Sequence, residues 1–319
     1  MRWFRTLVIL IVAGSAIVIA GAIGQQPASR PAPAGANTPA PPPAPSAKPD
    51  AEGTRLLAEA IKQLNPKKLA WVQTTFWEQA DVQGLTFQAQ GSYVSAPDHR
   101  LHMDLNVQMG EAPGKLEIVS DGKNLWEAMQ IGQQPRVVTK KVELAKVLDT
   151  LKGNVEAEQV REEFFQNQSF TGVVPLLQSI QKRMIVTGHE KTTLGGREVI
   201  RLTAAWIPEI AKAISTPDKP WPAYLARQCV LYFEPIGKEN ILWPRRLEWW
   251  GPAPPRQGES ILLQIEFRDP KLNQPLSDER CAREFKFDVG SGEIPDRTAQ
   301  EVEKVKARAE QLVKQKKSR

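Results

Sequence analysis

Histidine and carboxylate side chains are the first candidates for chemistry in this sequence. The chain contains three histidines, His99, His102 and His189. His99 and His102 are three residues apart in a stretch with strand-like alternation, so we expect them to point to opposite faces and not to share a metal ion. The acidic residues are scattered, and none form a pair at a spacing typical of general acid–base catalysis. The sequence therefore predicts no metal site and no catalytic residue.

Motifs of several large enzyme classes are also missing from the sequence. It contains no GxSxG motif of serine hydrolases, no phosphate-binding P-loop and no HExxH motif of zinc peptidases. We therefore expect a protein that is not an enzyme and needs no cofactor. A hydrolase whose site is assembled from distant residues would leave no such motif and is kept as an alternative.

Residues 1–24 have the features of an export signal. Arg2 and Arg5 precede an apolar stretch from Leu7 to Ile23, which ends in small residues suited to signal-peptidase cleavage. The apolar stretch is long for a signal peptide and slightly short for a membrane span. This segment is either a cleaved signal peptide or a retained anchor in the inner membrane. Both interpretations place the rest of the chain in the periplasm or elsewhere in the exported cell envelope.

Residues 25–53 are rich in proline and alanine and have no aromatic residue. Such a composition cannot bury enough surface to fold, so we expect a disordered linker. It is either a spacer that holds a folded domain away from the membrane or a leader that remains after cleavage.

Cys229 and Cys281 are the only cysteines in the chain. Cys229 lies in the strand-like stretch QCVLYFE, and Cys281 lies just before REFKFDV, which also alternates like a strand. An even pair of cysteines in an exported protein is typical of a disulfide, and neighbouring strands would bring these two together. Two free thiols are the alternative, because spacing alone does not establish pairing.

The net charge of +6 is confined to the two ends of the chain. Arg2 and Arg5 supply two positive charges, and the last nineteen residues contain seven basic and three acidic side chains. The part between is neutral overall. Because nucleic-acid binding requires a basic face on the folded domain itself, we expect no nucleic-acid partner.

Hydrophobic periodicity predicts an α+β domain over residues 54–296, followed by a basic C-terminal helix or tail at 297–319. A first helix is expected at 54–65, with Thr54 as its N-cap. Strands with short turns should follow, including a hairpin at Asp121-Gly122. Three helices are expected in the middle, at about 142–152, 156–168 and 173–183, and strands then resume and end with EFKFDV at 284–289.

Several short motifs resemble the LolA/LolB-like superfamily of bacterial envelope proteins. They are a Gly-x-hydrophobic strand, a Pro-x-x-Arg step, a Ser-Asp-Gly-Lys-x-Leu-Trp hairpin, a Pro-Arg-Arg strand opening and a terminal Phe-x-Phe strand. In this chain they lie at Gly91–Tyr93, Pro97–Arg100, Ser120–Trp126, Trp243–Glu248 and EFKFDV. The resemblance implies a strongly curved antiparallel sheet, an unclosed barrel, with helices covering its concave face.

The resemblance also implies an apolar cavity that binds lipid or lipoprotein acyl chains, for lipoprotein sorting or transport. The alternative is an envelope-stress sensor or scaffold that binds protein partners through the same fold. Trp126 is expected to line or border the cavity, with a plain core position as the competing interpretation. The residues predicted to line the cavity are Phe87, Leu101, Met103, Leu105, Trp126, Phe164, Phe165, Leu176 and Leu177.

Overall fold

A computed structural model describes most of the chain after residue 47. The described residues are 48–65, 69–82, 85–153, 157–167, 172–216, 218, 220–252, 258–273, 277–290 and 293–317. The predicted leader 1–24 and most of the predicted linker 25–53 lie outside them. Among the described residues, no helix is both long enough and apolar enough to cross a bilayer.

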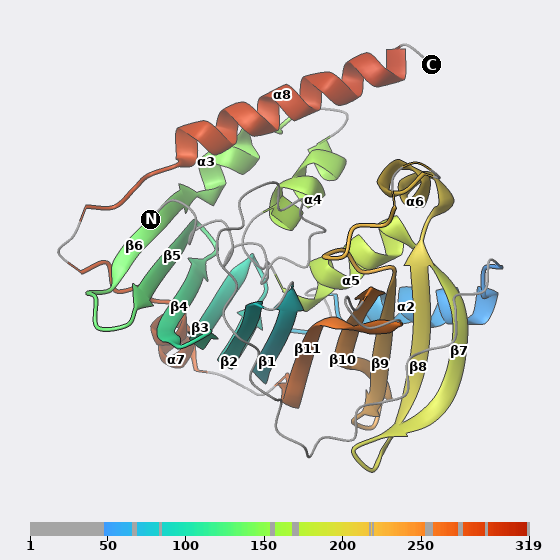
Figure 1. Ribbon diagram of the computed structural model, residues 1–319. Coiled ribbons are helices and arrows are strands. Elements are labelled where there is room, and N and C mark those ends of the chain that lie inside the picture. Colours follow the sequence, from blue (N-terminus) through green and yellow to red (C-terminus); the bar gives the residue numbers. More distant parts are fainter. Residues whose placement is uncertain are drawn as a thin grey trace.

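Eleven antiparallel strands form one sheet, which is open at both edges (Figure 1). The first six strands pair in sequence order and are β1 (Val72–Val82), β2 (Leu85–Ala96), β3 (Arg100–Met109), β4 (Ala112–Asp121), β5 (Asn124–Ile131) and β6 (Val137–Glu143). The last five also pair in sequence order and are β7 (Met184–Leu194), β8 (Arg197–Trp206), β9 (Gln228–Ile236), β10 (Ile241–Pro252) and β11 (Glu259–Leu272). The two series join because β1 pairs with β11, which leaves β6 and β7 as edges. This topology confirms the predicted unclosed antiparallel sheet.

Seven helices are described, and most of them pack on one face of the sheet. They are α2 (Ala51–Gln63), α3 (Leu144–Asp149), α4 (Ala157–Asn167), α5 (Val173–Arg183), α6 (Pro208–Ile214), α7 (Asp278–Glu284) and α8 (Thr298–Lys317). The predicted helices at 54–65, 156–168 and 173–183 correspond to α2, α4 and α5. Asp50 is the N-cap of α2, in place of Thr54, since its carboxylate accepts a hydrogen bond from the Gly53 amide at 3.0 Å.

We call the face that carries the main hydrophobic cluster the inner face, and the opposite one the outer face. α2, α3, α4, α5 and α8 all contribute buried residues to this cluster. Figure 1 shows α8 above α3 and α4, on this side of the sheet. Val305, Ala309 and Leu312 of α8 belong to the cluster, so the helix predicted as a tail takes part in the core of the domain.

Two local predictions are wrong. Residues 137–143 form edge strand β6, so the helix predicted at 142–152 shortens to α3. In the predicted strand EFKFDV, Glu284 ends helix α7, Phe285 is the C-cap of that helix, and residues 286–290 pair with no strand. The alternating rings of EFKFDV pack on the outer face instead, with Phe285 edge-on to Trp71 at 5.8 Å and Phe287 stacked on Trp126 at 5.4 Å between centroids.

The predicted disulfide between Cys229 and Cys281 is also wrong, and both thiols are free. Cys229 points inward from β9 and is fully buried in the main cluster. Cys281 lies on α7 and packs on the outer face, where Arg100 Nη1 lies 3.0 Å from its Sγ. The sheet separates the two sulfur atoms, because the segment after Cys281 is not a strand next to β9.

Gly91 marks a close approach between β2 and β3. A Cβ atom at this position would lie 1.8 Å from the backbone oxygen of Asp104, whereas a Cβ at Gly188 on β7 would meet nothing within 4 Å. Neither glycine has a positive φ, so neither position requires glycine for its backbone conformation, and the two differ in the space available to a Cβ atom.

We expect Gly91→Ala to lower the free energy of unfolding by about 3 kcal/mol or more, because the backbone of β3 must move to admit the methyl group. The matched variant Gly188→Ala should leave stability unchanged or raise it by up to about 1 kcal/mol. Urea unfolding followed by circular dichroism measures both. Equal stability of the two variants would contradict this packing of β2 on β3.

Candidate functional site

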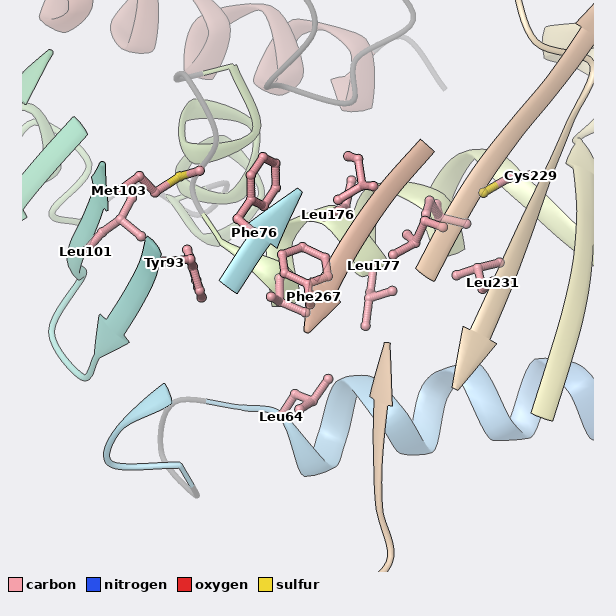
Figure 2. Packing of buried hydrophobic residues seen from close by; sticks show 14 of the residues in the cluster. Leu64, Phe76, Tyr93, Leu101, Met103, Leu176, Leu177, Cys229, Leu231 and Phe267 are labelled. Carbon is pink, nitrogen blue, oxygen red and sulfur yellow. The ribbon is translucent and has the colours of Figure 1, made fainter. Parts of the chain in front are cut away.

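The inner face brings most of the predicted cavity residues together. The cluster takes one of them from β2, three from β3, one from α4 and two from α5. Seven of the nine are buried in it: Phe87, Leu101, Met103, Leu105, Phe164, Leu176 and Leu177. Figure 2 shows Leu101 and Met103 on the sheet, with Leu176 and Leu177 beside Phe267. Each of the seven exposes at most 6% of its surface, so these side chains are closely packed.

Local sequence patterns explain why these side chains meet. Along β3, Leu101, Met103 and Leu105 alternate with polar residues, so that the apolar ones all face inward. On α5, Val173, Leu176, Leu177 and Ile180 recur at helical spacing and form one buried stripe. This stripe packs in the main cluster together with the inward side chains of the sheet.

Trp126 does not belong to this inner cluster, and the prediction that it lines the cavity is wrong. On β5, Leu125 faces inward, whereas Trp126 and Ala128 face outward. The ring of Trp126 lies parallel to that of Phe287, with 7° between the planes. The Arg136 guanidinium lies 4.6 Å from the centroid of the Phe287 ring. Trp126 therefore anchors Phe287, in the segment that follows α7, to the outer face.

Phe165 lies at the rim of the cluster and not inside it. It is half-buried, and its ring stacks on that of His99 with 4.3 Å between centroids and 18° between planes. His99 occupies the turn between β2 and β3. This turn packs against the turn between β4 and β5, as shown by Gly122, where a Cβ atom would lie 2.5 Å from the Asp98 backbone oxygen. The stack thus ties α4 to the turns at this end of the sheet.

Glu78 is a buried carboxyl group among the apolar side chains of the inner face. It points inward from β1 between Phe76 and Ala80, and its side chain is fully buried. Neither carboxyl oxygen has a hydrogen-bond partner among the described residues. Burial alone raises the pKa of this carboxyl from its ordinary value to about 8, because an apolar interior disfavours the charged form. At neutral pH the group is mostly protonated.

The strand register shows how isolated Glu78 is. It belongs to a row of seven inward-facing residues that crosses the sheet from β3 to β8. The row consists of Val107, Ala89, Glu78, Ile265, Leu247, Leu231 and Leu202. The other six members are apolar and buried in the main cluster.

A buried glutamate on the outer face provides a contrast. Glu248 of β10 is also fully buried, but its carboxylate accepts hydrogen bonds from the Trp250 indole at 3.0 Å and the Tyr232 hydroxyl at 3.2 Å. Burial raises its pKa, while the bond from Trp250 and the charge of Arg246 oppose the rise. Glu248 is therefore part of a satisfied network, and Glu78 is not.

Among the residues that the structure describes, no group of three or more His, Cys, Asp or Glu side chains is arranged to hold a metal ion. Sequence reasoning passed over Glu78, although a signal was present. In β1, Val72, Phe76 and Ala80 set the inward phase of the strand, and Glu78 stands in that phase.

The free energy of unfolding should therefore depend on pH through Glu78. Because its folded-state pKa of about 8 exceeds the ordinary value of 4.5, the folded state holds the proton more tightly. The stabilisation that this bound proton gives the folded state is complete below the ordinary pKa and is lost as pH rises through the folded-state pKa. We expect Glu78→Gln to unfold with a flatter pH dependence than wild type between about pH 5 and 8, as measured by urea titrations. Parallel curves for the two proteins would show that Glu78 ionises normally.

This chain was compared with protein families, curated proteins and solved structures. No family model matches it, and no curated protein matches it in sequence. Among solved structures, LprF from Mycobacterium bovis is similar with 11% identity over 72% of this chain and 96% of that chain, at a TM-score of 0.35. The lipoprotein LppX from Mycobacterium tuberculosis has 13% identity over 70% and 97% of the two chains, at 0.33. A putative outer membrane lipoprotein-sorting protein domain from Vibrio parahaemolyticus has 7% identity over 73% and 98%, at 0.26.

Proposed function

We propose that this is a non-enzymatic cell-envelope protein that binds the acyl chains of a lipid or lipoprotein between the inner face of the sheet and its helices. The observation that carries the proposal is the large apolar cluster on the inner face, to which five helices contribute and in which the carboxyl of Glu78 has no hydrogen-bond partner among the described residues. Lipoprotein sorting or transport in the periplasm is the role we propose for it. The N-terminal segment, if it is retained, would tether the domain to the inner membrane.

Acyl-chain binding requires burial rather than directional chemistry. Each buried methylene contributes about 0.8 kcal/mol, so ten methylenes contribute about 8 kcal/mol before ordering costs. An apolar sheet face and an apolar helix stripe supply this burial without any catalytic constellation.

A ligand must displace part of the cover, because the innermost side chains are packed. Met103, Leu105 and Leu177 have no accessible surface, so no water-sized space adjoins them. α4 is the element best suited to move. Its main packing partners are α5 and α8. The contacts that hold it include the Phe165–His99 stack and the ion pairs of Glu163 with Arg308 at 2.5 Å and with Lys182 at 3.7 Å, and Val160 and Phe164 are buried in the main cluster.

If α4 opens to admit a ligand, loosening its rim contact should speed both entry and exit. We expect Phe165→Ala and His99→Ala to raise the association and release rates of a fluorescent fatty-acyl probe by about fivefold, since a ring pair contributes roughly 1 kcal/mol. Stopped-flow fluorescence measures both rates. The buried neighbour Phe164 is a less suitable probe, because Phe164→Ala should cost about 3–5 kcal/mol of stability.

Trp126→Ala is the matched control, because it removes a ring stack of the same kind from the outer face. It should lower stability modestly and leave the probe rates unchanged. Equal acceleration by all three variants would mean that general loosening, and not opening at α4, admits the probe.

Native mass spectrometry of protein purified from membranes tests the ligand directly. A bound lipid or acylated peptide supports the proposal. A wild-type protein that binds no acyl probe and is purified with a protein partner instead would replace the proposal with the sensor or scaffold function.

A further inference from the structure

The unpaired carboxyl of Glu78 remains unexplained by a purely apolar ligand. Its two oxygens are buried and lack hydrogen-bond partners among the described residues, although it lies on the central strand of the inner face. An acyl chain alone would leave it just as unsatisfied.

The cost of this arrangement is considerable. Burying a polar group without a partner is destabilising even when the group is neutral, and more so when it is charged. An apolar residue of similar length would fit the surrounding row better and raise stability. Residues that weaken the fold at one position are typical of functional sites, where activity and stability compete.

The inward side chains next to Glu78 are short on its β2 side. Ala89 lies directly opposite on β2, Ala80 follows on the same inward phase of β1, and Gly91 lies opposite Phe76. Such short side chains cannot cover a carboxyl group. The atoms that cover it on this side must therefore belong to other residues of the main cluster, to which the helices contribute.

The chemistry of a protonated carboxyl narrows the choice of ligand. It has one O–H donor and an acceptor oxygen. A neutral carbonyl accepts from that O–H without bringing a charge into the apolar interior. An ammonium or a carboxylate would have to be desolvated there, since no charged partner on the neighbouring inward positions of β2 and β11 compensates it.

We propose that Glu78 is a binding residue for the head of the acyl ligand, and that it donates a hydrogen bond to the carbonyl of an acyl ester or acyl amide. This inference rests on the proposed acyl-binding function and specifies the part of the ligand that reaches the middle of the inner face. Acyl esters occur in glycerolipids and acyl amides occur at the N-termini of lipoproteins, so both sources present the required carbonyl.

Three pyrene-labelled probes of equal length test the inference: a fatty-acid methyl ester, the corresponding N-methyl amide and an alkane. Wild-type protein should bind the ester, the amide or both about tenfold more tightly than the alkane, which is the effect of one satisfied hydrogen bond. Glu78→Met should bind the carbonyl probes no more tightly than the alkane, and should melt at a higher temperature than wild type without ligand. Glu78→Gln keeps a donor and should retain a preference for the carbonyl probes.

Glu248→Met provides the control for loss of a buried glutamate. It leaves the Trp250 indole and the Tyr232 hydroxyl without their acceptor, so it should melt at a lower temperature and keep the tenfold preference. If wild type binds ester, amide and alkane equally, or if Glu78→Met keeps the preference, the inference is wrong while the proposed function stands. If wild type binds none of the probes, the proposed function fails and the inference fails with it. Tighter binding of the amide than of the ester would favour a lipoprotein source, whereas tighter binding of the ester would fit the acyl esters of a glycerolipid or of a lipoprotein; either supports the carbonyl contact.

Discussion

The pairing of β1 with β11 is the interaction on which the rest of the structure depends. It joins two antiparallel series of strands into one sheet and so creates a single inner face. Aromatic packing reinforces the junction, since Phe76 of β1 and Tyr93 of β2 both lie edge-on to Phe267 of β11. The Trp243 indole donates to the Phe267 carbonyl at 3.0 Å and attaches β10 to the same point. The junction thereby unites the strands that α3 and α8 contact with the strands that α2 and α5 contact.

Glu78 lies on this junction, and its position shows how one fold can serve two requirements. The apolar rows on either side stabilise the sheet and bury the helices. The carboxyl weakens that packing at one point, because nothing among the described residues satisfies it. On the outer face Glu248 shows the other solution, in which a buried carboxylate is surrounded by donors. The two glutamates are equally buried, so the difference in their partners distinguishes a structural carboxylate from a candidate binding group.

Sequence patterns predicted the parts of the fold that depend on local periodicity. The alternation in β3 and the helical spacing in α5 correctly grouped the residues of the inner face. Alternation alone could not say which phase of β5 faces inward, and for this reason Trp126 was assigned to the wrong face. EFKFDV alternates like a strand, but its rings pack on Trp71 and Trp126 rather than beside another strand. The pairing of the cysteines depended on that strand and was wrong for the same reason.

The junction of β1 with β11 also has a consequence for how the chain folds. The Thr74 hydroxyl donates a hydrogen bond to the Arg268 carbonyl at 2.6 Å, although the two residues are 194 positions apart in the sequence. Contacts of this kind form slowly, because a long loop must close before they are gained. As the chain is synthesised from its N-terminus, β1 to β6 can pair in order. The edge of β1 that pairs with β11 stays unpaired until β11 has been made. An unpaired edge strand is open to pairing with other chains. The half-formed sheet is therefore the stage of folding at which this chain is most exposed to pairing with other chains.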